Sequence, residues 1–110
     1  MKTPERRVKD DVAKKLRHAK AYYCMPVQMG LGRNNMLDVI ACVPTTKACV
    51  KCGHPAVFGQ FVSIETKAFK KSRLTGRQRR AATEIRHAKG IVFVVRGDRN
   101  DPKGFTWEAR

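Results

Sequence analysis

The chain has 110 residues, of which 24 are Lys or Arg and 9 are Asp or Glu, so its formal net charge is +15. This length suits one domain spanning residues 1–110, and the 42% hydrophobic content is too high for a disordered basic tail. No apolar run approaches the roughly 18 residues of a membrane span, and the segment Met1–Arg7 lacks the apolar stretch of a secretory signal. We therefore expect a cytoplasmic protein with no membrane partner, whose cysteines are thiols or metal ligands.

The positive charge is concentrated in one stretch. Seven basic residues and no acid lie between Lys67 and Arg80. Such an excess favours a polyanionic partner, because each Lys or Arg that reaches a phosphate releases condensed counterions. A solvated basic surface without a ligand is the alternative. A nucleic acid is the favoured partner, and the residues expected to contact it are Arg33, Lys70, Lys71, Arg73, Arg77, Arg79 and Arg80.

The first half of the chain reads as one helix and three extended segments. Thr3 and Pro4 suit an N-cap and a first helical position, and Val8, Val12 and Leu16 follow at helical spacing. This pattern predicts a helix of about 17 residues. The segments that follow are an extended stretch at 21–29, a loop at 30–35, an apolar strand at 36–43, a cysteine-bearing insertion at 44–55 and a second strand at 57–67.

The second half predicts a parallel strand pair. After a basic loop at 68–74, a helix is expected from Thr75 to Lys89, ended by Gly90, and the apolar run at 91–95 is a buried strand. A strand, a helix and an apolar strand in this order favour a right-handed crossover. No regular structure is assigned to the tail at 97–110, where Phe105 and Trp107 could cover the core or contact a second subunit. The expected fold class is α/β, with flanking helices on a mixed central sheet in the order α-β-β-β-α-β.

Asp38 is a charged residue in an otherwise apolar strand. Under two-residue alternation it shares a face with Ile40 and Cys42. Leu37 and Val39 then take the other face. A carboxylate with such neighbours is costly unless it is paired or bound to a metal. An arginine or a backbone N–H is the structural alternative to a metal.

Glu65 and Lys67 end the second strand and lie on one of its faces. If the strands at 36–43 and 57–67 pair antiparallel, Asp38 and Glu65 meet at one end of the sheet. Two adjacent carboxylates repel unless a cation separates them, and their oxygens suit Mg²⁺ or Mn²⁺. Such an ion can polarise a phosphate, while Lys67 holds a water or neutralises developing charge. A plain ion pair between Glu65 and Lys67 is the alternative.

Two helical positions that should be apolar are polar. On a helical wheel Glu5 lies in the stripe of Val8, and Gln78 lines up with Ala82, so both are expected to face the sheet. Each has a local alternative, because Glu5 complements the helix dipole and Gln78 fits a capping box with Thr75. The convergence of these polar residues predicts one catalytic site, made of Glu5, Asp38, Glu65, Lys67 and Gln78.

Taken together, these features resemble the virus-type replication-repair nuclease (VRR-NUC) domain of the PD-(D/E)XK nuclease superfamily. The residues that carry the resemblance are Glu5, the approach Gly32–Asp38, Glu65-Thr66-Lys67, Thr75-x-x-Gln78 and the strand Gly90–Val95. The resemblance implies that Asp38, Glu65 and the Thr66 carbonyl bind the catalytic Mg²⁺ or Mn²⁺, and that Lys67 is the catalytic lysine. It also implies a stand-alone phage-type nuclease, often a homodimer, that acts on branched DNA.

The cysteines suggest a second site. Cys49-Val50-Lys51-Cys52-Gly53-His54 resembles a zinc knuckle, and Cys42 plus His54 could complete a tetrahedral structural zinc site with Cys49 and Cys52. Reduced thiols in a long hairpin, or a disulfide, are the alternatives. Cys24, in an apolar segment, is expected to be buried.

These inferences predict a metal-dependent DNA endonuclease that is selective for branched structures such as Holliday junctions rather than for sequence. Backbone contacts carry no sequence code, and cutting two strands of a junction favours a symmetric dimer. The alternative is a non-catalytic basic module that binds nucleic acid, with or without zinc. The buried acids distinguish the two, because a passive binder has no use for carboxylates that face phosphate.

Overall fold

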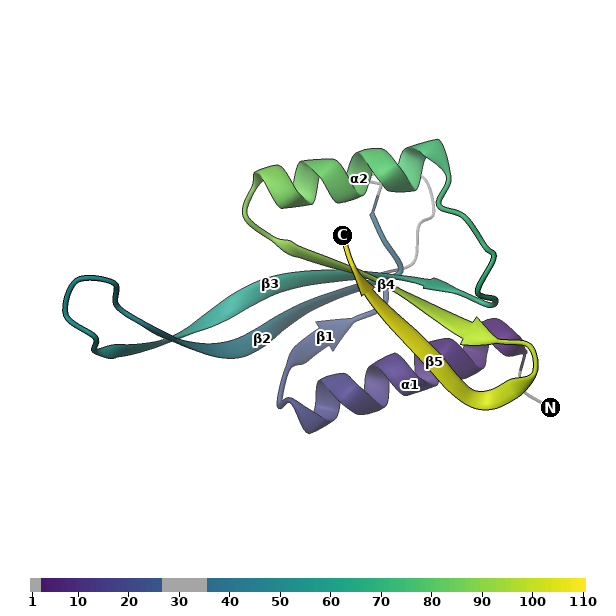
Figure 1. Ribbon diagram of the computed structural model, residues 1–110, viewed down its shortest axis with the longest axis horizontal. Helices are drawn as coiled ribbons and strands as arrows, with labels where there is room; N and C mark the ends of the chain where they lie inside the picture. Colours follow the sequence, from purple (N-terminus) through teal and green to yellow (C-terminus); the bar gives the residue numbers. More distant parts are fainter. Residues whose placement is uncertain (1–2, 27–35) are drawn as a thin grey trace.

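A computed structural model describes residues 3–26 and 36–110. A five-stranded sheet in the order β1-β2-β3-β4-β5 lies between two helices, with α1 on one face and α2 on the other (Figure 1). Strands β3 and β4 are parallel, and the other neighbouring strands are antiparallel. This confirms the predicted mixed α/β fold. The elements are α1 (Pro4–His18), β1 (Tyr22–Cys24), β2 (Val39–Ala48), β3 (Pro55–Lys67), α2 (Gly76–His87), β4 (Ile91–Asp98) and β5 (Asp101–Ala109).

Both helices begin at the predicted caps. The Thr3 hydroxyl accepts the N–H of Arg6 at 3.2 Å, and Thr75 opens α2 with a capping box. After α2 the left-handed residue is Lys89, with φ 72°, rather than Gly90. Glycine at position 90 allows a close approach of α2 instead, because a Cβ there would lie 2.6 Å from Ile85 Cγ2. Neither helix, nor any other in the described part of the chain, has the length and apolar character needed to cross a membrane.

The core has a larger layer under α1 and a smaller one under α2. The α1 layer joins Val8, Val12 and Leu16 to sheet residues such as Val39 and Ile64. The α2 layer consists of Leu37, Ala81, Ala82 and Val92, with Ile85 beside them. Leu37 was expected to share a face with Val39, and this was wrong. Because β2 begins only at Val39, the two-residue alternation does not extend back to Leu37.

The tail is ordered as a strand, contrary to expectation. β4 continues to Asp98, and β5 returns antiparallel along it. The Trp107 ring packs edge-on against Phe93 with ring centroids 5.5 Å apart, and its Nε1–H points to Asp11 at 3.5 Å. Phe105 also packs on the α1 layer of the core. The aromatic residues of the tail therefore cover the core.

Strands β2 and β3 extend beyond the rest of the molecule as a hairpin (Figure 1). We call residues 44–59 the arm. Pairing continues to Ala48 and Pro55, so half of the polar connection expected at 44–55 is strand, and 49–54 form the loop. The arm contributes to a longest dimension of 51 Å. Most of its side chains are exposed, including Val57 at 75%.

Candidate active site

The N-terminal end of α2 faces the point where the β2 ladder stops and β3 ends. The β2–β3 register places Val39 opposite Ile64, so the chain before Val39 no longer pairs with β3 through its backbone. At this point the Asp38 side chain, instead of the backbone, accepts hydrogen bonds from β3. Its Oδ2 accepts the backbone N–H of Thr66 at 3.0 Å and the Thr66 hydroxyl at 2.7 Å.

Gln78 joins the acids to the lysine. Its Nε2 donates to Glu65 Oε2 at 3.0 Å, and its Oε1 accepts from Lys67 Nζ at 2.9 Å. The same Oε1 accepts the backbone N–H of Thr75 at 2.9 Å, which completes the capping box. Gln78 therefore both caps α2 and bonds to the acid and the lysine of the candidate site, the two roles that the sequence left as alternatives. The structure brings together Asp38, Glu65, Lys67 and Gln78, with Thr66 between the two charged residues of β3.

Glu65 occupies a costly position for a carboxylate. Its side chain is buried, with 2% exposure. Burial, and next the repulsion from the Asp38 carboxylate, raise the pKa of Glu65 to about 8. Lys67 opposes the shift but does not cancel it. Without a cation, the raised pKa therefore favours the protonated form of Glu65 at neutral pH.

The donor set fits a hard divalent cation. Two acidic side chains in direct contact offer oxygen ligands, and Mg²⁺ needs only one or two carboxylates because it keeps several waters. Mn²⁺ accepts the same ligands. A third protein ligand would have to be a backbone carbonyl such as that of Thr66. In the described residues, no group of three or more His, Cys, Asp and Glu side chains is placed to hold a metal.

Basic residues follow Lys67 along the chain. The loop between β3 and α2, with the first turns of α2, presents exposed basic residues next to Lys67. Two have protein partners: Lys70 pairs with Asp98 at 3.3 Å, and Arg79 donates to the Leu74 carbonyl at 2.9 Å. Arg33 lies outside the described residues. The exposed basic residues of this loop and helix, which we call the basic rim, are Lys70, Lys71, Arg73, Arg77, Arg79 and Arg80.

Sequence reasoning missed Arg99. It lies in the turn between β4 and β5, with its guanidinium 4.9 Å from the centre of the Phe69 ring. The turn and the basic loop line one hollow of about 550 Å³, which includes Lys70 and Lys71. The tail was expected to be irregular, so nothing in the sequence placed Arg99 next to the basic rim.

Glu5 does not face the sheet, and the expectation from the helical wheel was wrong. Its side chain is 54% exposed and lies 3.8 Å from Lys9, one turn along α1. It occupies the first turn of the helix, where it complements the dipole. A helical wheel does not show where the helix begins to pack on the sheet. In α1 the buried residues start at Val8, so Glu5 lies before the packed part of the helix.

The four proposed zinc ligands do not come together. Cys42 lies in the β2–β3 ladder opposite Phe61. From there to Ala48 the strand advances about 20 Å, at about 3.3 Å per residue. Cys49, Cys52 and His54 are at the far end of the arm. Cys24, expected to be buried, is exposed.

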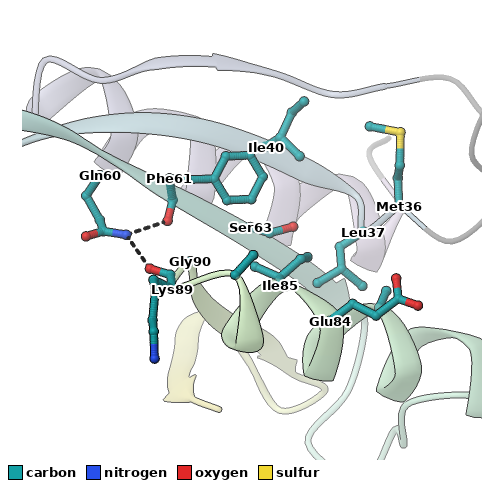
Figure 2. A pocket seen from close by; sticks show the side chains of 12 residues that line it. Met36, Leu37, Ile40, Gln60, Phe61, Ser63, Glu84, Ile85, Lys89 and Gly90 are labelled. Atoms are coloured by element: carbon teal, nitrogen blue, oxygen red, sulfur yellow. Dashed lines mark hydrogen bonds between the residues drawn. The ribbon is translucent and has the colours of Figure 1, made fainter.

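A separate cleft of about 630 Å³ opens between the C-terminal half of α2 and the sheet (Figure 2). Met36, Leu37, Ile40, Phe61 and Ile85 make its lining largely apolar. At one end Gln60 Nε2 donates to the Phe61 and Lys89 carbonyls at 3.0 and 3.2 Å, and Ser63 and Glu84 add polar groups to the lining. The acids of the cluster and Lys67 do not line it. The candidate chemistry is therefore at the opposite, N-terminal half of α2.

No protein-family profile and no curated protein matches the sequence. Solved structures that are similar in fold include a VRR_NUC domain and a Holliday junction resolvase. One, a VRR_NUC domain, aligns with a TM-score of 0.63 at 17% identity over 92% of this chain and 91% of that one. The other, the Holliday junction resolvase Hjc of the archaeal hyperthermophile Archaeoglobus fulgidus, aligns with a TM-score of 0.57 at 14% identity over 94% of this chain and 75% of that one. The chain therefore shares its fold with a VRR_NUC domain and with the resolvase Hjc.

Proposed function

We propose that this protein is a metal-dependent DNA endonuclease that hydrolyses phosphodiester bonds. The single observation that carries the proposal is the hydrogen-bonded cluster in which Gln78 links Glu65 to Lys67 beside Asp38. A buried carboxyl in contact with a second, half-buried acid is costly in free energy, so stability alone does not explain the cluster. Its location within a basic rim suits a phosphate substrate.

Each residue of the cluster has a definite task in this proposal. Asp38, Glu65 and the Thr66 carbonyl would hold Mg²⁺ or Mn²⁺. When bound, the ion supplies a Lewis acid that polarises the scissile phosphate and promotes deprotonation of water. Lys67 orients the attacking water or offsets charge on the phosphate, and Gln78 fixes the position of the Lys67 ammonium.

The preferred substrate is proposed to be branched DNA. The basic rim and Arg99 would contact the phosphates of the DNA backbone. Such contacts depend on the shape of the DNA rather than on its sequence. The fold shared with a Holliday junction resolvase supports the same choice. A homodimer would supply the two active sites needed to cut two strands of a junction.

A cleavage assay tests the proposal. The wild-type protein with Mg²⁺ or Mn²⁺ is expected to cut a four-way junction faster than a linear duplex, and chelation should abolish cutting. Asp38→Asn and Lys67→Met should lower the rate by at least about 100-fold, a loss typical of transition-state contacts, while retaining DNA affinity. The matched control is Lys103→Met, which removes an exposed lysine from β5.

The competing function is a non-catalytic nucleic-acid-binding module, which the net charge of +15 favours equally. In that case junction binding would be retained without metal-dependent cutting. Equal cleavage by wild type, Asp38→Asn and Lys67→Met would trace the activity to a contaminant and refute the assignment.

A further inference from the structure

The end of the arm holds two thiols in a preformed turn. The N–H of Cys49 donates to the His54 carbonyl at 2.8 Å, and the N–H of Gly53 donates to the Cys49 carbonyl at 2.9 Å. Gly53 adopts a positive φ of 72°, which a residue with a side chain rarely takes. Cys49 and Cys52 are both exposed, so neither has a packing role.

The turn also fixes the spacing of the two cysteines. Cys52 follows Cys49 after two residues, inside the turn that the Gly53 N–H closes on the Cys49 carbonyl at 2.9 Å. Two cysteines separated by two residues also have the spacing found in structural zinc sites. The turn therefore offers a pair of soft ligands that needs little rearrangement.

One chain supplies only half of such a site. A structural zinc ion takes four ligands. In the described part of the chain, no third His, Cys, Asp or Glu joins Cys49 and Cys52 in a metal-binding group. Cys42, the next cysteine along β2, is held back in the ladder opposite Phe61. The other two sulfurs of a four-thiolate site would come from another molecule.

A second copy of the chain is the partner that fits. The arm extends clear of the body, and its strands stay paired up to Ala48 and Pro55, so two tips can approach without obstruction (Figure 1). A two-fold axis through the ion would bring four sulfurs around it, the tetrahedral set that zinc prefers. Zinc with four thiolates carries a net charge of −2, which Lys47 and Lys51 of each copy would offset.

We propose that the tip of the arm is a zinc half-site, and that Cys49 and Cys52 of two copies together bind one Zn²⁺. Binding releases one proton from each thiol that is protonated beforehand, and no oxidation is involved. The tip is separate from the cluster at Lys67, so the proposal is independent of nuclease activity.

The test uses the full-length reduced protein with Zn²⁺ alone, and with Co²⁺ as its spectroscopic substitute. We expect one zinc ion per two chains, a sulfur-to-cobalt charge-transfer intensity that corresponds to four thiolates per ion, and a sedimenting species of two chains in the zinc-loaded form. Cys49→Ser and Cys52→Ser should each weaken zinc binding at least tenfold. Cys24→Ser and Cys42→Ser, at two other exposed cysteines, should leave it unchanged.

Several results would overturn the proposal. One zinc ion per chain, a zinc-loaded monomer, or two thiolates per cobalt would assign the ligands to a single chain. Unchanged zinc binding by Cys49→Ser, or no binding by reduced wild type, would remove the site. Circular dichroism shows whether each variant is folded, and the exposed tip should tolerate serine.

Discussion

Thr66 donates two hydrogen bonds to the same oxygen of Asp38, one from its backbone N–H at 3.0 Å and one from its hydroxyl at 2.7 Å. The backbone donor is available because β2 pairs with β3 only from Val39 onward. Asp38 is therefore held by the residue between Glu65 and Lys67. The three ionisable residues of the site are therefore linked through Thr66, the residue between Glu65 and Lys67 in the sequence.

Thr66→Val tests this link. Valine keeps the shape of threonine and leaves the backbone N–H in place, but it removes the 2.7 Å bond to a charged acceptor. Such bonds contribute about 1.5–3 kcal/mol, so we expect junction cleavage to fall at least about tenfold. Thr66→Ser, which keeps the hydroxyl, should remain near wild type. Cleavage by Thr66→Val at the wild-type rate would show that the hydroxyl does not position Asp38.

The two roles of Gln78 can be separated. Thr75→Ala removes the side chain that accepts the Gln78 N–H, but it leaves the bonds of Gln78 to Glu65 and Lys67. It should cost about 1 kcal/mol of stability, the usual value of an N-cap, with cleavage retained. Gln78→Met removes both contacts and should lower cleavage by about 10- to 100-fold. Denaturant unfolding and single-turnover cleavage, measured on both variants, provide the comparison.

If Gln78 acted only as a cap, both variants would lose activity in proportion to their loss of stability. Cleavage by Gln78→Met equal to that by Thr75→Ala, at temperatures where both are folded, would support that simpler interpretation.

The raised pKa of Glu65 predicts an unusual pH dependence of stability in the metal-free protein. Between the ordinary value of 4.5 and about 8, the folded state holds a proton that the unfolded state has lost. The free energy of unfolding should therefore decrease as pH rises through this interval, by an amount on the order of a few kcal/mol. Urea unfolding from pH 5 to pH 8.5 in chelator measures it.

Glu65→Gln should flatten this pH dependence, because it removes the titrating group, and Glu5→Gln, at an exposed acid, should not. Mg²⁺ or Mn²⁺ should stabilise wild type at pH 8 more than Glu65→Gln, since binding to the folded state alone adds stability. If the free energy of unfolding of wild type and of Glu65→Gln changed with pH in the same way, Glu65 would not be the source of the pH dependence.

Much of the site could be predicted because local rules govern it. Two-residue alternation on β3 places Glu65 and Lys67 on one face, and the capping box at Thr75 sets the first turn of α2. The parallel crossover from β3 to β4 then brings Gln78 over that face. The proximity of Asp38 to Glu65 follows from antiparallel pairing of β2 with β3. Each step needed only neighbouring residues or one strand pairing.

Features that depend on distant packing could not be predicted. β5 contains Pro102 and Gly104, which favour turns, and it forms because Phe105 and Trp107 pack on the core beneath α1. The predicted zinc site of Cys42, Cys49, Cys52 and His54 was wrong for a similar reason. Cys42 is seven residues from Cys49 in sequence, which suits a compact loop, but a continuous ladder separates them.

The basic rim should control affinity rather than chemistry. Arg77→Ala removes an exposed guanidinium next to Gln78. We expect weaker junction binding and a salt slope reduced by about one, as for the loss of one phosphate contact, with the single-turnover rate at saturating protein unchanged. Lys103→Ala, the matched exposed control, should alter neither. A loss of rate at saturation would instead assign Arg77 a role in the reaction.

Gly97 determines how closely β4 can pass the end of β3. A Cβ at this position would lie 2.6 Å from the Ala68 carbonyl oxygen and 3.0 Å from Val8 Cγ2. The first of these atoms belongs to the backbone directly after Lys67, so it cannot move without shifting the lysine. We expect Gly97→Ala to destabilise the protein by about 1–3 kcal/mol and to slow cleavage even where it is fully folded.

Gly76→Ala is the control, because its Cβ would meet only Arg79 at 3.9 Å, and alanine favours a helix by up to about 1 kcal/mol over glycine. It should be neutral or stabilising. Thermal unfolding and single-turnover cleavage of both variants decide the matter. If Gly97→Ala is as stable as wild type, the backbone at Ala68 can move to accept the added Cβ. The close approach of Gly97 to Ala68 then does not hold Lys67 in place.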